Sequence, residues 1–190
     1  MFEDLKKITE LSSIKDKDIF YEASFNYENT LKLFQELKNN ELFNFDQLID
    51  ITAIDYPSRK KRFELVYILL SMKKNKRIIL KTPINENDSI DSIIQIFKSS
   101  DWYERECYDL FGIKFNNHPD LRRIMTDYNF EGHPLRKDFP LTGHTEVRYN
   151  DLEKKVVYEP VKLTQEYRDF DYTSPWEGMP KGIDDHNEQD

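Results

Sequence analysis

The chain has 190 residues, of which 38% are hydrophobic and 14% aromatic, and this is enough for one globular domain with an extension. The formal net charge of −8 at pH 7 argues against a nucleic-acid partner, because contacts to phosphates need a basic surface. The single cysteine, Cys107, excludes an internal disulfide and a cysteine-ligated zinc or iron–sulfur site within the chain, and it favours a reducing compartment.

Neither a membrane span nor a targeting segment is expected. The longest apolar run extends only from Leu65 to Leu70, whereas about 20 residues are needed to cross a bilayer. The first residues lack an apolar core and include the acidic Glu3 and Asp4, which is unlike a signal or transit peptide. We therefore expect the protein to be made in, or close to, the compartment where it works.

The first half of the chain reads as alternating strands and helices. Hydrophobic periodicity predicts a short strand over 18–25, an amphipathic helix over 29–38 and a strand over 45–55. The apolar run of 62–72 is typical of a central strand with both faces covered. A tight turn then leads into its hairpin partner, 76–82.

Two further helices are predicted before the composition changes. Isoleucines at helical spacing predict a helix over 90–98. A second helix covers 101–111, and Gly112 is suited to end it. Together the elements predict an α+β domain over 1–115, with a mixed four-stranded sheet covered by helices.

A long extended C-terminal arm is predicted to follow this domain. Six of the eight prolines come after Phe115, and the apolar residues lose their periodicity. So long a stretch without regular structure is uncommon inside a compact domain, yet aromatic residues recur throughout it. We expect residues 116–180 to form a partner-binding arm and 181–190 to form a disordered acidic tail.

The predicted helix over 101–111 has two different faces. One face is apolar and should pack on the sheet; it carries Tyr103, Cys107, Leu110 and Phe111. The opposite face carries Trp102, Arg105, Glu106 and Asp109. A solvated stripe of charges is the simple interpretation of that face. The arginines and aromatic residues close to it favour an interface with paired charges instead.

The residues that follow this helix make the pattern specific. Glu-Arg-Glu at 104–106 is followed at fixed spacings by an acid, two apolar residues, a histidine, an arginine and a second apolar pair, namely Asp109, Leu110, Phe111, His118, Arg122, Ile124 and Met125. This pattern resembles the signature of the 30 kDa subunit of respiratory complex I. Further stretches resemble that family in place and order: 48–57, 62–71, 132–143, 147–149, 170–171 and 174–176.

The resemblance implies a non-catalytic structural and assembly subunit of the hydrophilic arm of a proton-pumping NADH:ubiquinone oxidoreductase. Such a subunit docks on the 49 kDa subunit, near the quinone module. The holoenzyme uses FMN, iron–sulfur clusters, NADH and quinone, whereas this chain is expected to hold no cofactor. The implied location is the matrix side of the mitochondrial inner membrane, or alternatively the cytoplasmic face of a bacterial inner membrane.

The charged residues of the matching stretches are the expected interface. They are Glu104, Arg105, Glu106, Asp109, His118, Arg122, Arg123, Arg136, Lys137 and Asp138. They are expected to pair with charges of other subunits of the complex, so that the chain works in a hetero-oligomer without spanning the membrane itself.

Two alternatives remain open. The chain could be the equivalent subunit of a related membrane-bound hydrogenase or plastid complex. The second alternative is a stand-alone metal-dependent enzyme that uses His118, His133 and His144 as ligands. The spacing of these histidines matches no helical ligand pair, so we expect no metal site.

Overall fold

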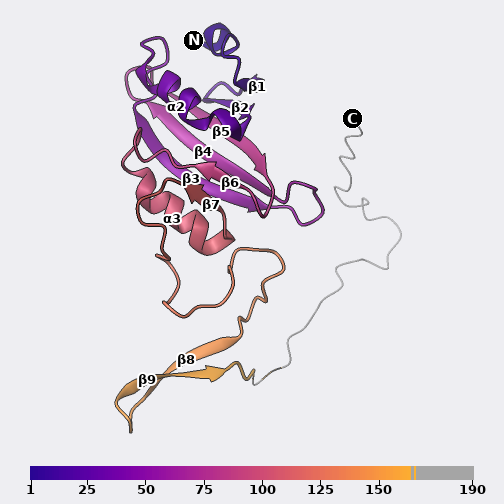
Figure 1. Cartoon of the computed structure of the whole chain (residues 1–190), viewed down its shortest axis with the longest axis vertical. Helices are drawn as coiled ribbons and strands as arrows, with labels where there is room; N and C mark the ends of the chain where they lie inside the picture. The colour runs from indigo at the N-terminus through magenta and orange to yellow at the C-terminus, as the bar shows by residue number, and fades with distance from the viewer. Residues whose placement is uncertain (164, 166–190) are drawn as a thin grey trace, which may run out of the picture. The chain divides into compact units, whose positions relative to one another are not determined.

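The computed structural model describes residues 1–163 and residue 165 (Figure 1). The end of the predicted arm, with the matching stretches 170–171 and 174–176, and the predicted tail 181–190 lie outside the described residues. The chain divides into two compact units, residues 1–143 and a second unit that begins at His144. The boundary predicted at Phe115 is not tested by this division, since a compact unit need not be the smallest part that folds.

A five-stranded mixed sheet forms the centre of the first unit. The strand order is β1-β2-β5-β4-β3, in which β2 and β5 run parallel and the other neighbours antiparallel. The strands are β1 (Leu11–Asp16), β2 (Phe20–Phe25), β3 (Gln47–Asp55), β4 (Phe63–Ser71) and β5 (Lys76–Ile84). The α+β class and the mixed sheet are confirmed. The extra strand, β1, is an edge strand with one buried residue, Leu11, so hydrophobic periodicity could not reveal it.

The last residues of β5 show why Pro83 does not end that strand. The pairing of β2 with β5 stops at Lys81, whereas β4 pairs with β5 as far as Ile84. The side of β5 that faces β2 is therefore free at Pro83. A proline is tolerated at such a position because no ladder hydrogen bond is lost there.

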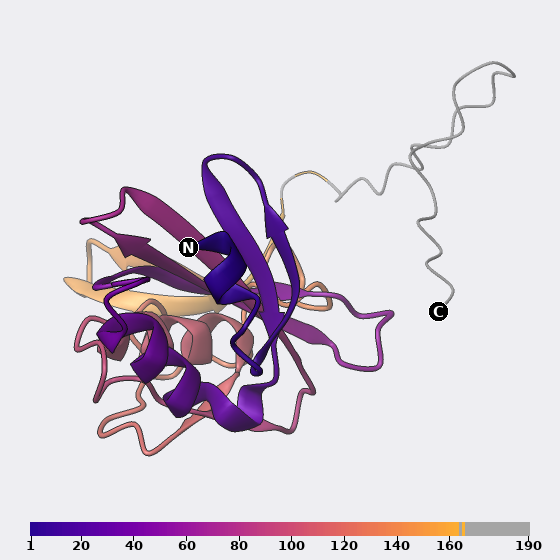
Figure 2. The same ribbon diagram turned by 90° about the horizontal axis from the view of Figure 1, so that it is seen from above.

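Two helices cover one face of the sheet. The remaining regular elements of this unit are α1 (Phe2–Leu5), the 3-10 helix η1 (Tyr27–Asn29), α2 (Thr30–Asn39), β6 (Ser89–Asp91), α3 (Ser100–Phe111) and β7 (Lys114–Asn116). The ring of Phe34 on α2 lies 4.8 Å from Tyr67 of β4, and Phe111 on α3 lies 6.5 Å from Phe63 of β4. Since Phe63 and Tyr67 point to the same side of β4, α2 and α3 share a face of the sheet (Figure 2).

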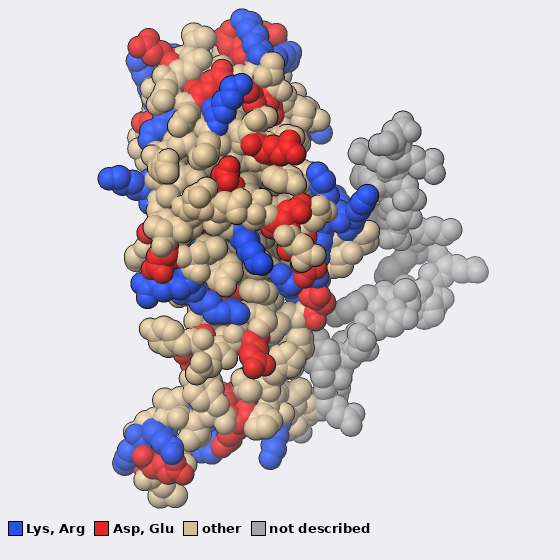
Figure 3. Space-filling model, in the orientation of Figure 1, with Lys and Arg blue, Asp and Glu red and all other residues tan. Residues whose placement is uncertain are grey.

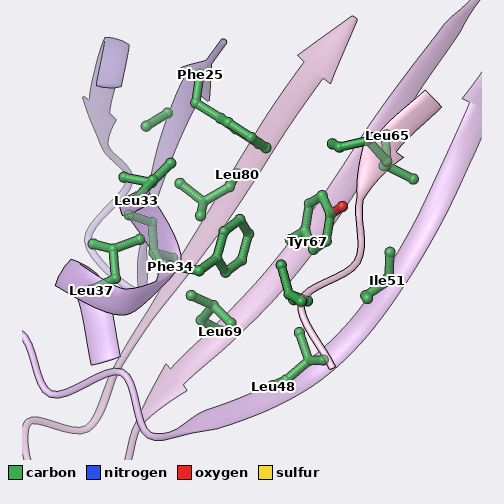
Figure 4. Close-up of a cluster of buried hydrophobic side chains, with 14 of the residues drawn as sticks. Phe25, Leu33, Phe34, Leu37, Leu48, Ile51, Leu65, Tyr67, Leu69 and Leu80 are labelled. Atoms are coloured by element: carbon green, nitrogen blue, oxygen red, sulfur yellow. The ribbon is translucent and has the colours of Figure 1, made fainter. Parts of the chain in front are cut away.

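The core lies between these helices and the sheet. Figure 4 shows Leu33, Phe34 and Leu37 of α2 facing Tyr67, Leu69 and Leu80 of the central strands. All six side chains are fully buried. The predicted helix over 29–38 and the predicted central strand over 62–72 are thereby confirmed to within two residues at each end.

The predicted helix over 90–98 is wrong. The chain forms the short strand β6, paired in parallel with β7, and then a single turn in which Phe97 N–H donates to Ile93 C=O. Tertiary partners occupy the amides that would start a helix: Ser92 N–H donates to Asn116 C=O, and Ile93 N–H to the Glu104 carboxylate. Ile90, Ile93 and Phe97 are nevertheless buried, so their spacing reports the core and not a helix.

The predicted arm begins with a non-regular segment and continues as a hairpin. Residues 117–143 contain no helix or strand and contribute to the first unit. The second unit contains a two-stranded antiparallel hairpin of β8 (Thr145–Asn150) and β9 (Lys155–Pro160). Within the described part of the chain, none of the helices has the length and apolar character that a membrane span requires.

Candidate interface around helix α3

Helix α3 ends where the sequence predicts. Gly112 adopts the left-handed conformation, with φ of 80°, and its N–H donates to the Tyr108 carbonyl. A Cβ at this position would come within 2.4 Å of Arg136 Nη2 and 2.7 Å of His133 Nε2. Both the backbone conformation and the close packing therefore require glycine at the end of α3.

The apolar face of α3 packs on the edge strand β3. Cys107 and Phe111 are buried and Tyr103 and Leu110 are half-buried. The Cys107 thiol donates to the carbonyl of Ile51 at a distance of 3.3 Å. Burial raises the pKa of this thiol well above its usual range, so Cys107 serves as a small, neutral core residue.

Asp109 is the most densely bonded residue of the candidate interface. Its carboxylate is fully buried and accepts the backbone N–H groups of Ile124, Met125 and Thr126 at 2.7–2.9 Å. It also accepts from the Thr126 hydroxyl and pairs with Arg123 at 2.8 Å. Burial alone would raise the pKa of Asp109, but these hydrogen bonds hold it well below its usual range.

Glu104 is also fully buried, but it is poorly satisfied. Oε1 accepts from Ile93 N–H at 2.9 Å, while Oε2 has no hydrogen-bond partner among the described residues. Burial raises the pKa of Glu104 above its usual value. His118 Nε2 lies 3.9 Å from Glu104 Oε2 and contacts the Asp101 carbonyl at 3.2 Å, while Nδ1 of the same ring accepts from Asp120 N–H.

The predicted arginines mostly bind backbone carbonyls of the same chain. Arg105 donates to the carbonyls of Arg122 and Arg123, and Arg123 donates to the carbonyl of Gly132 as well as to Asp109. Arg136 donates to the carbonyl of Phe111 at 2.6 Å. These contacts hold residues 117–143 against α3 without regular secondary structure.

A second charge cluster fastens the end of this segment to the sheet. Arg62 forms a two-pronged pair with the buried Asp55, at 2.8 and 2.9 Å, and also contacts Asp138 at 2.8 Å. The backbone N–H of Lys137 donates to Asp55 at 2.7 Å. The Arg62 guanidinium lowers the pKa of the Asp55 carboxyl. Sequence reasoning included Lys137 and Asp138 but missed Asp55 and Arg62, which lie far away in sequence.

The ten predicted interface residues therefore fall into two groups. Glu104, Arg105, Asp109, His118, Arg123, Arg136 and Asp138 make the contacts within the chain described above. Glu106 is half-buried, Lys137 has an exposed side chain, and Arg122 is largely exposed beside Asp120. Their role at an interface with another subunit stays a prediction.

Large apolar side chains project from the same region. They are Trp102 of α3 and, in the segment 117–143, Met125, Tyr128, Leu135 and Leu141. Tyr128 is 93% exposed. The sequence offers no signal for this exposure, because it depends on how the segment folds back on α3.

Metal-ligating side chains do not gather in the described part of the chain. His133 Nδ1 contacts the Asp109 carbonyl at 2.8 Å, and His118 is bonded at both ring nitrogens. The widest groove lies away from α3, where β2 and β5 end. Its basic residues Arg59 and Lys81 are paired with Glu64 and Glu22.

Comparisons with known proteins converge on one family. A model of the family described as respiratory-chain NADH dehydrogenase, 30 Kd subunit, matches residues 24–145. A subunit of the NADH-quinone oxidoreductase of Hyphomonas neptunium is 55% identical over 152 residues, covering 80% of this chain and 75% of that protein. The protein of the same name from Parvibaculum lavamentivorans is 49% identical over 175 residues, covering 88% of each.

A solved structure has a similar fold. A chain of the membrane-bound sulfane sulfur reductase, an archaeal respiratory membrane complex, matches with a TM-score of 0.63 and 24% identity, over 73% of this chain and 82% of that one. At this identity the likeness concerns the fold alone.

Proposed function

Because the chain belongs to the family of the 30 kDa subunit of respiratory-chain NADH dehydrogenase, we propose that it is a non-catalytic structural and assembly subunit of the hydrophilic arm of a proton-pumping NADH:quinone oxidoreductase. In this proposal it docks on the 49 kDa subunit, near the quinone module. The complex supplies the FMN, the iron–sulfur clusters and the sites for NADH and quinone from its other subunits.

The hairpin of the second unit is the observation that carries this proposal. In the β8–β9 register, Val147 lies opposite Tyr158, and Tyr149 opposite Val156. These four residues share one face of the hairpin, because side chains alternate along a strand. Each of them is more than half exposed. An isolated two-stranded hairpin is marginal in water, so a ribbon with an exposed apolar face fits a segment that packs on another protein.

The segment 117–143 supports the same function. Its backbone is fixed from within by the buried carboxylates of Asp109 and Asp55, and its large apolar side chains point outwards. A rigid loop that displays Met125, Tyr128 and Leu141 loses little conformational entropy on binding. The charged residues predicted for the interface would then act mainly by positioning this loop.

The proposal that the chain holds no cofactor rests on its donor groups. The single thiol, Cys107, is buried, raised in pKa and bonded to a backbone carbonyl. His118 and His133 bind backbone groups of the same chain. Iron–sulfur clusters need several thiolates, and zinc needs about four convergent ligands.

The location follows the parent complex in this proposal. The chain would lie on the matrix side of the mitochondrial inner membrane or on the cytoplasmic face of a bacterial inner membrane. The bacterial relatives favour the second location. An equivalent subunit of a related membrane-bound complex is the second candidate, and the fold shared with the archaeal sulfane sulfur reductase favours it.

Assembly of the complex tests the docking role. A Val147→Thr/Tyr158→Thr variant keeps β-forming residues but removes apolar surface, so we expect several-fold less assembled complex, with normal turnover per complex that remains. Glu146→Thr, on the opposite face of the hairpin, should assemble normally. A normal amount of complex with the double variant would refute the docking role, and normal assembly with lost turnover would indicate a direct catalytic role.

A further inference from the structure

Two turns from distant parts of the chain lie side by side at one end of the sheet. One turn joins β1 to β2 and the other joins β4 to β5. Since β2 and β5 are parallel neighbours, with Phe20 opposite Arg77, the turns that precede them lie at the same end (Figure 1). The Lys76 ammonium donates to the Asp18 carbonyl, which joins the two turns directly.

The two turns together form a basic surface, here called the turn patch and defined as residues 15–19 and 72–77. It contains six cations and two carboxylates: Lys15, Lys17, Lys73, Lys74, Lys76 and Arg77 against Asp16 and Asp18. Among the described residues, none of the six cations lies within ion-pair distance of a carboxylate. Elsewhere, as on the face shown in Figure 3, basic and acidic side chains are largely interspersed.

Large apolar side chains accompany these charges. Ile19 is 70% exposed and Met72 is 64% exposed, one on each turn. A row of lysines alone is usually a solvated edge that prevents sheets from pairing. Exposed apolar side chains with charges around them are instead the composition of a binding surface, in which an apolar centre is surrounded by a charged rim.

The backbone of the turn patch is held in place by hydrogen bonds. Asp18 and Asn75 adopt positive φ values of 60° and 49°, which close the two turns tightly. Lys17 N–H donates to the Phe20 carbonyl at 3.0 Å, and Met72 N–H donates to the Asp46 carboxylate at 3.1 Å. A surface fixed in this way loses little entropy when a partner binds.

We propose that the turn patch is a docking surface for an acidic segment of another protein subunit, which also covers Ile19 and Met72 with an apolar side chain. Charge complementarity selects this partner, because the patch is strongly basic in a chain whose net charge is −8. A flat anionic membrane would meet Asp16 and Asp18 together with the cations, whereas a narrow segment can lie between them. The proposal does not depend on docking by the hairpin or by the segment 117–143.

Lysine labelling of the full chain, alone and in the purified complex, tests the proposal. Reaction with acetic anhydride should slow at least fivefold on assembly at Lys15, Lys17, Lys73 and Lys74, while the exposed controls Lys60 and Lys98 change little. Zero-length coupling with a carbodiimide should join these four lysines to Asp or Glu of another subunit. Equal labelling in both states would overturn the proposal. Coupling only to carboxylates of this chain, or protection that is lost when lipid is removed, would also overturn it.

A charge-reversal variant provides the second test. Lys73→Glu/Lys74→Glu should weaken retention of this subunit in the complex at least fivefold at moderate salt. Lys60→Glu/Lys61→Glu, at another exposed loop, should behave as the unmodified chain. Equal thermal unfolding of both variants would show that the fold is intact, as expected for exposed positions. Unchanged retention of the first variant would refute the turn patch as a docking surface.

Discussion

The Asp109 carboxylate lies 2.8 Å from the Arg123 guanidinium and, at the same time, accepts three backbone N–H groups from the residues that follow Arg123. A single buried charge on α3 thus determines the path of a loop that has no secondary structure. The geometry resembles an anion bound by a ring of amides, with the anion supplied by the chain itself.

Replacing this charge should loosen the loop. Asp109→Asn would place an NH₂ group against N–H donors and leave Arg123 unpaired, so we expect a loss of about 3–5 kcal/mol in the free energy of unfolding. Urea unfolding would measure this loss. Asp120→Asn is the matched control, since its pair with Arg122 is exposed and should contribute no more than about 0.5 kcal/mol. Equal effects of the two substitutions would contradict the role assigned to Asp109.

The depressed pKa of Asp109 gives the protein an acid limit. The folded pKa lies below the ordinary value of 3.8, so the stabilisation is complete above that value and is lost as the pH falls through the folded pKa. We expect the free energy of unfolding to decline below about pH 4 in the unmodified chain and less steeply in Asp109→Asn. Parallel pH profiles for the two proteins would show that Asp109 is not the source of the decline.

Glu104 should respond to pH in the opposite direction. Burial raises its folded pKa above the ordinary value of 4.5, so the neutral acid is favoured and stability is lost as the pH rises through the folded pKa. Glu104→Gln keeps an oxygen for Ile93 N–H without a charge, and it should equal or exceed the stability of the unmodified chain at pH 7. Its advantage should shrink at pH 4. A variant clearly less stable than the unmodified chain at pH 7 would mean that the charged form is well stabilised.

Two glycines allow backbone strain to be separated from crowding. Gly112 and Gly143 have φ values of 80° and 70°, but a Cβ at Gly143 meets nothing within 4 Å. Gly143→Ala should cost about 1–2 kcal/mol, from its backbone alone. Gly112→Ala should cost a further ~1–3 kcal/mol, because Arg136 and His133 are held by hydrogen bonds and cannot move aside freely. Thermal unfolding of the two variants would test this difference, and equal costs would contradict it.

Cys107 should be chemically silent in the folded protein. Its thiol is buried, raised in pKa and donated to the Ile51 carbonyl, so the reactive thiolate is scarce and inaccessible. We expect the rate of labelling by iodoacetamide to rise at least a hundredfold when urea unfolds the chain. Rapid labelling of the native protein would show that α3 separates readily from β3.

Local patterns predicted the elements that depend on burial alone. The central strand and the two helices α2 and α3 show their apolar spacing directly, and Gly112 marks the end of α3. The pattern misled where side chains from elsewhere capture the backbone: Glu104 binds the amide of Ile93 and prevents a helix there. It also placed Asp109 on an outward face, because the loop that buries this residue follows later in the chain. No local rule reports that Asp55 and Arg62 will fasten residues 137–138.

The parallel pairing of β2 with β5 sets an order for folding. The strands β3, β4 and β5 are consecutive antiparallel neighbours and can form as soon as each is made, since only short loops must close. By contrast, β2 must wait until the chain as far as β5 is complete before it can pair. During synthesis, we therefore expect the β3–β4–β5 meander to collapse first, while the N-terminal hairpin of β1 and β2 joins it later as the slow, long-range step.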